Sequence, residues 1–209
     1  MRNIAAIVLF AAMPLVSNAH FVWVYADTTK TARIEITDKP GEAPVPLKIV
    51  SGNKGTDFAP VGLQDIKPAT DGKRLQALMT APSGALTLVY GLHGDDLVTW
   101  YAKATTNLAS AAKPLGRPYE ITVRHDKNGL AATVWHDGKP FKGATVELYG
   151  NGLAKDLTLL SDSHGEVKFG AVKGGYLCIG AEIKVPQAGT HKGKQYKGKL
   201  EMASLTVRM

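Results

Sequence analysis

The chain has 209 residues, of which 44% are hydrophobic and 21% are charged. This composition is ordinary for a globular protein and excludes a disordered chain. Lysine and arginine outnumber aspartate and glutamate by 25 to 18, which gives a formal charge of +7. The lysines are scattered, without an arginine cluster or interleaved aromatic residues. We therefore interpret the charge as a solvated basic surface, open to anionic envelope polymers, and not as a nucleic-acid site.

The first 19 residues have the pattern of an export signal. Arg2 supplies an early positive charge, an apolar run follows from Ile4 to Val16, and small residues stand at Ser17 and Ala19. A leader peptidase reads small residues at these positions, so we expect this signal peptide to be removed. The mature chain would begin at His20, contain 190 residues and be periplasmic or secreted. No later apolar run reaches the ~20 residues of a transmembrane helix.

His20 provides the clearest chemical indication in the sequence. A free N-terminal histidine offers its α-amine and its ring Nδ1, which together can close a chelate on one metal ion. Imidazole nitrogens suit copper and nickel. Two further candidate ligands are His93, with Asp95 and Asp96 nearby, and His191 in a lysine-rich late segment. We therefore expect a Cu or Ni site in which His20 supplies the amine and imidazole and either His93 or His191 completes the coordination. The alternative is that His20 follows the cleavage site by accident.

Strand patterns run through the whole mature chain. Apolar residues alternate with other residues at period two, and clusters of Gly, Pro, Asp and Asn separate the runs. Residues 56–73 contain two prolines and are expected to be loop, with at most a short strand at 61–63. Residues 106–112 are expected to be a linker or a single helical turn. The expected strands are 20–26, 32–37, 45–50, 75–80, 85–91, 97–104, 119–124, 130–136, 144–149, 157–161, 166–169, 176–183 and 200–208.

A domain boundary is predicted where Pro114, Gly116 and Pro118 lie close together. Beyond it the strand pattern starts again. We expect an N-terminal β-sandwich domain over 20–112 and a C-terminal β-sandwich domain over 117–209. The predicted fold is all-β, with two antiparallel sandwiches of immunoglobulin-like or transthyretin-like type after the signal peptide.

The cysteine content limits the available chemistry. Cys178 is the single cysteine of the chain, which excludes an intrachain disulfide and a thiolate metal cluster. It lies in an apolar strand and is expected to be a small buried hydrophobic residue. The sequence shows no Gly-x-Ser-x-Gly elbow, no His-Glu-x-x-His motif and no phosphate-binding glycine loop. We therefore expect a binding protein and not an enzyme.

The C-terminal half resembles a known β-sandwich module. The resemblance rests on the run from Trp135 to Leu148, which contains the turn Asp137-Gly138-Lys139-Pro140, and on the later segments 161–169 and 174–176. These segments are similar to the repeat of carboxypeptidase-regulatory-like modules. The resemblance implies an immunoglobulin-like sandwich for this half, and a fold alone implies little about function.

A wider resemblance covers nearly the whole mature chain. It rests on the Ala-His-Phe-x-Trp start at residues 19–23, Tyr-Ala-Lys-Ala at 101–104, the Asp-Gly-Lys-Pro turn, the segment 189–196 and the closing residues 203–207. These features resemble the DUF4198 family of exported bacterial proteins, which carries the label NikM-like. The resemblance implies an exported protein connected with nickel uptake.

Three functional hypotheses follow from these observations. The first is a metal-binding protein for uptake, storage or delivery of copper or nickel, with a membrane transporter as partner. The second is an envelope interaction module that binds a protein or a polysaccharide without metal. The third is a copper oxidase of the histidine-brace kind, which requires a second histidine beside His20 and an open coordination position on the metal.

Overall fold

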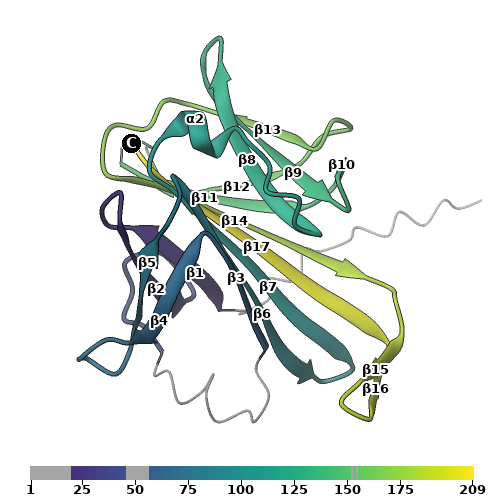
Figure 1. The fold of residues 1–209 in the computed structure, drawn as a ribbon. Coiled ribbons are helices and arrows are strands. Elements are labelled where there is room, and N and C mark those ends of the chain that lie inside the picture. Colours follow the sequence, from purple (N-terminus) through teal and green to yellow (C-terminus); the bar gives the residue numbers. More distant parts are fainter. Residues whose placement is uncertain (1–19, 46–56, 152, 154) are drawn as a thin grey trace, which may run out of the picture.

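The computed structural model describes residues 20–45, 57–151, 153 and 155–209, and these residues are nearly all in strands (Figure 1). The predicted all-β class is confirmed. The described helix is the single turn α2, Leu108–Ala111, in the segment that was expected to be a linker or one helical turn. In the part of the chain that the structure describes, no helix is long and apolar enough to cross a bilayer. The strand expected at 45–50 falls almost entirely outside the described residues.

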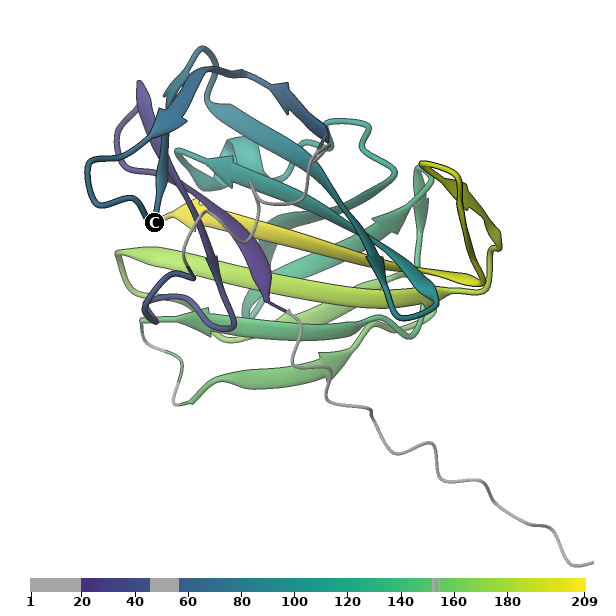
Figure 2. The ribbon, with the colours of Figure 1, turned by 90° about the horizontal axis from the view of Figure 1, so that it is seen from below.

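A seven-stranded sheet forms the centre of the protein, with the strand order β12-β11-β14-β17-β7-β6-β3. Its strands are β3 (Asp57–Val61), β6 (Ser83–His93), β7 (Asp96–Thr105), β11 (Thr145–Gly150), β12 (Leu157–Leu160), β14 (Tyr176–Val185) and β17 (Gly198–Arg208). All neighbours are antiparallel except β7 and β17, which pair in parallel with Trp100 opposite Met202. In Figure 2, β17 runs through the middle of this sheet in yellow.

The two halves predicted from the sequence therefore share one sheet. Strands β3, β6 and β7 precede the expected boundary, whereas β11, β12, β14 and β17 follow it. Two separate sandwich domains are not confirmed. The physical reason is that β7 and β17 pair along ten residues, which places the two halves side by side through backbone hydrogen bonds.

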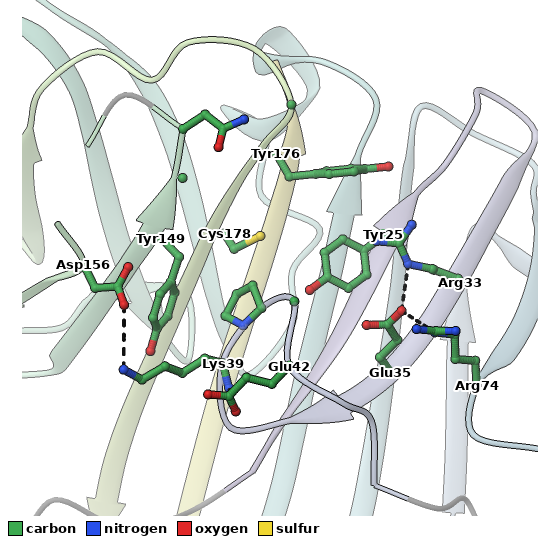
Figure 3. A pocket seen from close by; sticks show the side chains of 15 residues that line it. Tyr25, Arg33, Glu35, Lys39, Glu42, Arg74, Tyr149, Asp156, Tyr176 and Cys178 are labelled. Atoms are coloured by element: carbon green, nitrogen blue, oxygen red, sulfur yellow. Dashed lines mark hydrogen bonds and ion pairs between the residues drawn. The ribbon is translucent and has the colours of Figure 1, made fainter. Parts of the chain in front are cut away.

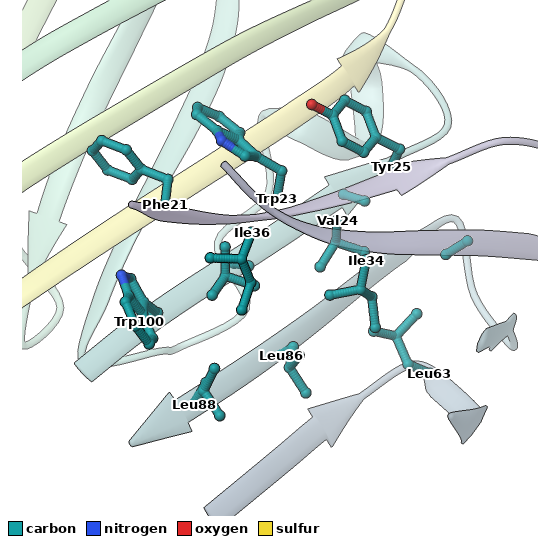
Figure 4. Close-up of a cluster of buried hydrophobic side chains, with 14 of the residues drawn as sticks. Phe21, Trp23, Val24, Tyr25, Ile34, Ile36, Leu63, Leu86, Leu88 and Trp100 are labelled. Carbon is teal, nitrogen blue, oxygen red and sulfur yellow. The ribbon is translucent and has the colours of Figure 1, made fainter. Parts of the chain in front are cut away.

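A second sheet, with the order β1-β2-β5-β4, stands on one face of the central sheet (Figure 1). Its strands are β1 (Phe21–Ala26), β2 (Thr31–Thr37), β4 (Leu63–Pro68) and β5 (Leu75–Met79). All six residues of β1 are buried, because this strand is packed on both of its faces. Val24 lies on one face with Ile34, and Phe21, Trp23 and Tyr25 lie on the other (Figure 4).

The free edge of β1 is attached to the central sheet by side chains. Four alternate carbonyl groups of this edge each accept a hydrogen bond from a buried or partly buried donor. The four donors and acceptors are Trp100 Nε1 to His20 O at 2.8 Å, Ser204 Oγ to Val22 O, Thr206 Oγ1 to Val24 O, and Tyr176 OH to Ala26 O at 2.9 Å. These bonds satisfy carbonyl groups that would otherwise be buried without partners. They also close an edge on which another strand could pair.

A third sheet covers the other face of the central sheet. It contains β8 (Tyr119–Asp126), β9 (Gly129–His136), β10 (Lys139–Pro140) and β13 (Glu166–Phe169), with β9 in the middle. Side chains of β17 alternate between the two cores, since Met202 belongs to the core against β1 whereas Ala203 and Leu205 belong to the core against β8 and β9. The central sheet is therefore buried on both faces.

Residues 56–73, which were expected to be mainly loop, contain β3 and β4. Both are edge strands, and an edge strand tolerates the prolines that suggested a loop, here Pro60 and Pro68. Gly62 joins the two strands at φ +65°, and a Cβ at this position would lie 2.5 Å from the carbonyl oxygen of Ser83. A second unpredicted element is the hairpin of β15 (Gly189–His191) and β16 (Lys194–Tyr196).

The segment between the two halves is held by a buried ion pair. The Lys103 ammonium, on β7, donates to the carbonyl of Lys113 at 2.7 Å and lies 3.9 Å from the Glu120 carboxylate. Glu120 accepts from the backbone N–H groups of Leu115 and Gly116 at 2.8 and 2.9 Å. Burial lowers the pKa of Lys103 to about 8, although the Glu120 charge acts in the opposite direction. The proline-rich segment is therefore fixed to the central sheet.

Candidate functional site

His20 lies beside Asp38 at the start of the β1-β2 pair. His20 precedes β1 and Asp38 follows β2, and the register Phe21 to Thr37 places these two residues next to each other across the ladder. The His20 Nδ1 and Asp38 Oδ1 atoms are 2.5 Å apart. The two side chains are 44% and 52% exposed. A ring nitrogen and a carboxylate oxygen therefore converge at the surface, and this nitrogen is the one that an N-terminal histidine chelate uses.

His93 lies at the tip of the β6-β7 hairpin, opposite Asp96. The nearby carboxylates of Asp95 and Asp96, which suggested a metal site in the sequence, form ion pairs with lysines. Asp95 is 2.7 Å from the Lys197 ammonium, and Asp96 is 2.7 Å from the Lys184 ammonium. The hydrogen bond and charge of Lys197 lower the pKa of the Asp95 carboxyl. The two carboxylates next to His93 are therefore engaged in ion pairs with lysines from later in the chain.

His191 lies in the β15-β16 hairpin, opposite Lys194. Among the described residues, no group of three or more His, Cys, Asp or Glu side chains is placed to hold a metal ion. The structure therefore does not bring His20, His93 and His191 together in one such group. Sequence reasoning missed Asp38, which follows the second predicted strand. An antiparallel pairing of the strands 20–26 and 32–37 would have placed it opposite His20.

His136 is partly buried and lies beside a buried carboxylate. Its Nε2 atom is 3.0 Å from Glu201 Oε2, and the two side chains are 21% and 7% exposed. His136 ends β9 and Glu201 lies on β17, so the pair connects the third sheet with the central sheet. His164 is an exposed turn residue, and its backbone N–H donates to the Asp162 carboxylate at 2.8 Å.

A pocket of about 840 Å³ opens where the β1-β2 sheet meets β11 and β14 of the central sheet. Its walls include Tyr25 from β1, Tyr149 from β11, and Tyr176 and Cys178 from β14 (Figure 3). The rings of Tyr25 and Tyr176 are 5.3 Å apart in an edge-to-face arrangement. The pocket lies in the angle between two sheets. The sheet β1-β2-β5-β4 packs its apolar residues against β17, and the neighbouring strands β14 and β11 form the other side of the angle.

The wall on the β2 side of the pocket is charged. Arg33 and Arg74 donate from their Nε atoms to the same oxygen of Glu35, at 2.8 and 2.7 Å, and the Glu35 residue is 4% exposed. The Arg33 guanidinium also lies 4.2 Å from the centre of the Tyr25 ring, in cation–π geometry. Because the buried Glu35 carboxylate is paired with two guanidinium groups, these interactions offset the free-energy cost of removing its charge from water.

Tyr25 and Cys178 form the inner end of the pocket. Each residue is 3% exposed. The Tyr25 hydroxyl has no hydrogen-bond partner among the described residues. The Cys178 thiol is close enough to interact with this hydroxyl and to raise its pKa, but a thiol is only a weak donor and acceptor, and the contact lacks the geometry of a normal hydrogen bond. Burial raises the pKa of Tyr25, and it raises the pKa of Cys178 to about 12. Cys178 is thus the buried, uncharged residue expected from the sequence.

Comparison with known proteins gives no functional assignment. A scan of the chain against protein-family models finds no match, and a search of curated proteins finds none. The candidate sites are therefore defined by their residues alone: the His20–Asp38 pair at the surface, and the pocket between the two sheets.

Proposed function

We propose that this protein is an exported transition-metal-binding protein that holds Cu(II) or Ni(II) at His20 and Asp38, for uptake, storage or delivery of the metal. The observation that carries the proposal is the 2.5 Å distance between His20 Nδ1 and Asp38 Oδ1 at the surface. This pair combines an imidazole nitrogen with a carboxylate oxygen, and N,O ligand sets suit these two ions.

Removal of the first 19 residues would supply the third ligand. The cut would release the α-amine of His20, and the amine and Nδ1 belong to one residue, so they can close a chelate ring. The Asp38 carboxylate would add a negative charge next to them. His93 and His191 are not needed for these three ligands. Metal ligands bind in their deprotonated forms, so the affinity for metal would fall as the pH falls.

The backbone of His20 is fixed before any metal arrives. Its carbonyl accepts a hydrogen bond from Trp100 Nε1 at 2.8 Å, and the Trp100 residue is 7% exposed. The residue that follows, Phe21, packs against Gly180 and is buried. Because the first residue of the mature chain would be held at its carbonyl end, less conformational entropy is lost when the metal binds.

The choice between delivery and oxidation rests on Asp38. A histidine-brace oxidase needs a second imidazole beside the N-terminal histidine, and the partner of the His20 ring here is a carboxylate. We therefore propose storage or delivery, with a transporter as partner. The resemblance to the exported, NikM-like DUF4198 family agrees with this assignment.

The proposal includes a sandwich arrangement for each half of the chain, of immunoglobulin-like or transthyretin-like type. Support comes from the two hydrophobic cores. One core is formed mainly by residues 21–104, with Tyr149, Cys178 and Met202 added from the second half, and the other by residues 111–207.

The test is a calorimetric titration with Cu(II) and Ni(II), with electron paramagnetic resonance for copper. Four proteins are compared: the chain that begins at His20, the same chain with one Gly before His20, Asp38→Asn, and the matched control His164→Ala. We expect one ion per chain. The extra Gly should weaken binding by about 100-fold or more, and Asp38→Asn by about 10-fold. His164→Ala should bind like the parent. Equal weak binding by all four proteins would overturn the proposal.

A further inference from the structure

We propose that the pocket between the β1-β2 sheet and strands β11 and β14 binds a neutral, polyhydroxylated ligand, namely one or two sugar rings of a glycan. The pocket volume, about 840 Å³, lies in the range of small-molecule sites. This site uses none of the residues of the proposed metal site, so the two proposals stand or fall separately.

The charges of the pocket are balanced and already engaged. Its lining includes three cations and three carboxylates, namely Arg33, Lys39, Arg74, Glu35, Glu42 and Asp156. Both guanidinium groups are bonded to Glu35, and the Lys39 ammonium is 3.7 Å from Asp156. Glu42 accepts from the backbone N–H of Lys39 at 3.3 Å. An anionic ligand would have to draw Arg33, Arg74 or Lys39 away from its carboxylate, whereas a neutral ligand would not.

The same groups keep hydrogen-bonding capacity for neutral hydroxyls. The side chains of Arg33 and Arg74 are 33% and 40% exposed, and a guanidinium has five N–H donors. The Asp156 side chain is 59% exposed and offers acceptors, and Asn151 offers both a donor and an acceptor. Neighbouring hydroxyls of a sugar ring both donate and accept, so they match a wall of this kind.

The Tyr25 hydroxyl is the most specific feature of the pocket. The residue is 97% buried, and its hydroxyl makes no hydrogen bond of normal geometry among the described residues; its polar neighbour is the weakly bonding Cys178 thiol. A buried polar group without a partner is costly, so its presence at the end of a cavity indicates that a ligand group completes it. A ligand hydroxyl can accept from this O–H and can also donate to its oxygen.

Access to Tyr25 runs past the turn at residues 39–42. Lys39 and Glu42 of this turn lie across the pocket from Tyr25 (Figure 3). The turn is tied to the opposite wall by the Lys39–Asp156 pair, whose side chains are 54% and 59% exposed. An exposed pair of this length contributes little to stability, so a small shift of the turn costs little. The half-buried Tyr176 ring, which lies above the pocket in Figure 3, offers an apolar surface to a sugar ring.

The test measures binding of a fixed panel of neutral mono- and disaccharides by saturation-transfer NMR, followed by calorimetry, in buffer that contains EDTA. The panel covers glucose, galactose, mannose, xylose and N-acetylglucosamine units, and the amino acids glutamate and lysine, which carry a net charge at neutral pH, serve as charged competitors. The key variant is Tyr25→Phe, which removes one hydroxyl. Its matched control is Tyr119→Phe, because Tyr119 also has a buried, unpartnered hydroxyl but does not line the pocket. Asn151→Ala is a second variant at the exposed wall.

We expect at least one neutral sugar to bind the parent protein and Tyr119→Phe equally. Tyr25→Phe should bind it about 10-fold more weakly or worse, while its melting temperature stays the same or rises. Asn151→Ala should also bind it more weakly. The proposal is overturned if no sugar of the panel binds, if neither pocket variant changes binding, or if amino acids bind in preference to sugars. Because EDTA removes free metal ions, sugar binding in this buffer is independent of whether the metal proposal holds.

Discussion

The hydroxyl of Ser204 on β17 donates a hydrogen bond to the carbonyl of Val22 on β1, 182 residues earlier in the chain. Thr206 repeats this contact two residues later, at the carbonyl of Val24. The last strand of the protein therefore holds the edge of the first strand. This attachment fixes strand β1, which His20 precedes and which contributes Tyr25 to the pocket.

Loss of these hydroxyls should destabilise the protein. Ser204→Ala and Thr206→Val each leave a buried carbonyl of β1 without its partner, which costs about 1–3 kcal/mol of unfolding free energy. Urea denaturation measures the effect. Ser163→Ala, in an exposed turn, is the matched control and should change stability by less than about 0.5 kcal/mol. If Ser204→Ala is as stable as the control, the attachment does not contribute to folding.

The buried Lys103 should give stability an unusual dependence on pH. Burial lowers its pKa to about 8 in the folded protein, whereas an unfolded lysine titrates near pH 10.4. Between about pH 8 and 10 the unfolded chain therefore binds more protons than the folded chain, and stability rises with pH. The contribution is on the order of 1–3 kcal/mol.

The variant Lys103→Met keeps the aliphatic length and should remove this rise, as measured by urea denaturation across the same pH range. Lys142→Met, at an exposed position, should keep it. If the free energy of unfolding changes with pH in the same way for the parent and Lys103→Met, the rise in stability does not come from Lys103. Buried tyrosines make stability fall as the pH rises, which is the opposite effect. They do so only above about pH 10, because their pKa is raised from that value in the folded protein.

Two turn glycines should respond differently to the same substitution. Gly165 has φ +71°, and a Cβ there would lie 2.8 Å from both the Val134 carbonyl oxygen and the Phe141 nitrogen. Gly138 has φ +73°, but no atom lies within 4 Å of its Cβ position. Gly138→Ala should therefore cost about 1 kcal/mol from the backbone conformation alone. Gly165→Ala should cost about 3 kcal/mol or more, since backbone atoms cannot move aside. Equal losses in thermal unfolding would show that the contacts at Gly165 relax.

Cys178 should be unreactive in the folded protein. Burial raises its pKa to about 12, and the thiolate is the form that reacts with alkylating reagents. At pH 8, iodoacetamide should leave the native protein unlabelled for hours and should label it fully in urea, as followed by mass spectrometry. Rapid labelling without urea would show that the inner end of the pocket opens often.

Several parts of this structure were readable from the sequence alone. Alternating apolar residues predicted most strands, because a half-buried strand needs this pattern whatever its partner is. The turn with Gly138 was readable because its backbone conformation favours glycine. The burial of Cys178 followed from its apolar neighbours. The loop expected at 56–73 was wrong, since proline signals do not distinguish a loop from an edge strand.

Other features were decided by the tertiary structure. The parallel pairing of β7 with β17 joins residues about 100 positions apart, and no local pattern specifies which buried strand pairs with which. The contact of His20 with Asp38 depends on strand register, and the pocket at Tyr25 depends on the angle between two sheets. Local alternation thus determined the strands of this protein, whereas long-range packing determined which of its side chains meet, because contacts between distant strands depend on the whole set of competing pairings.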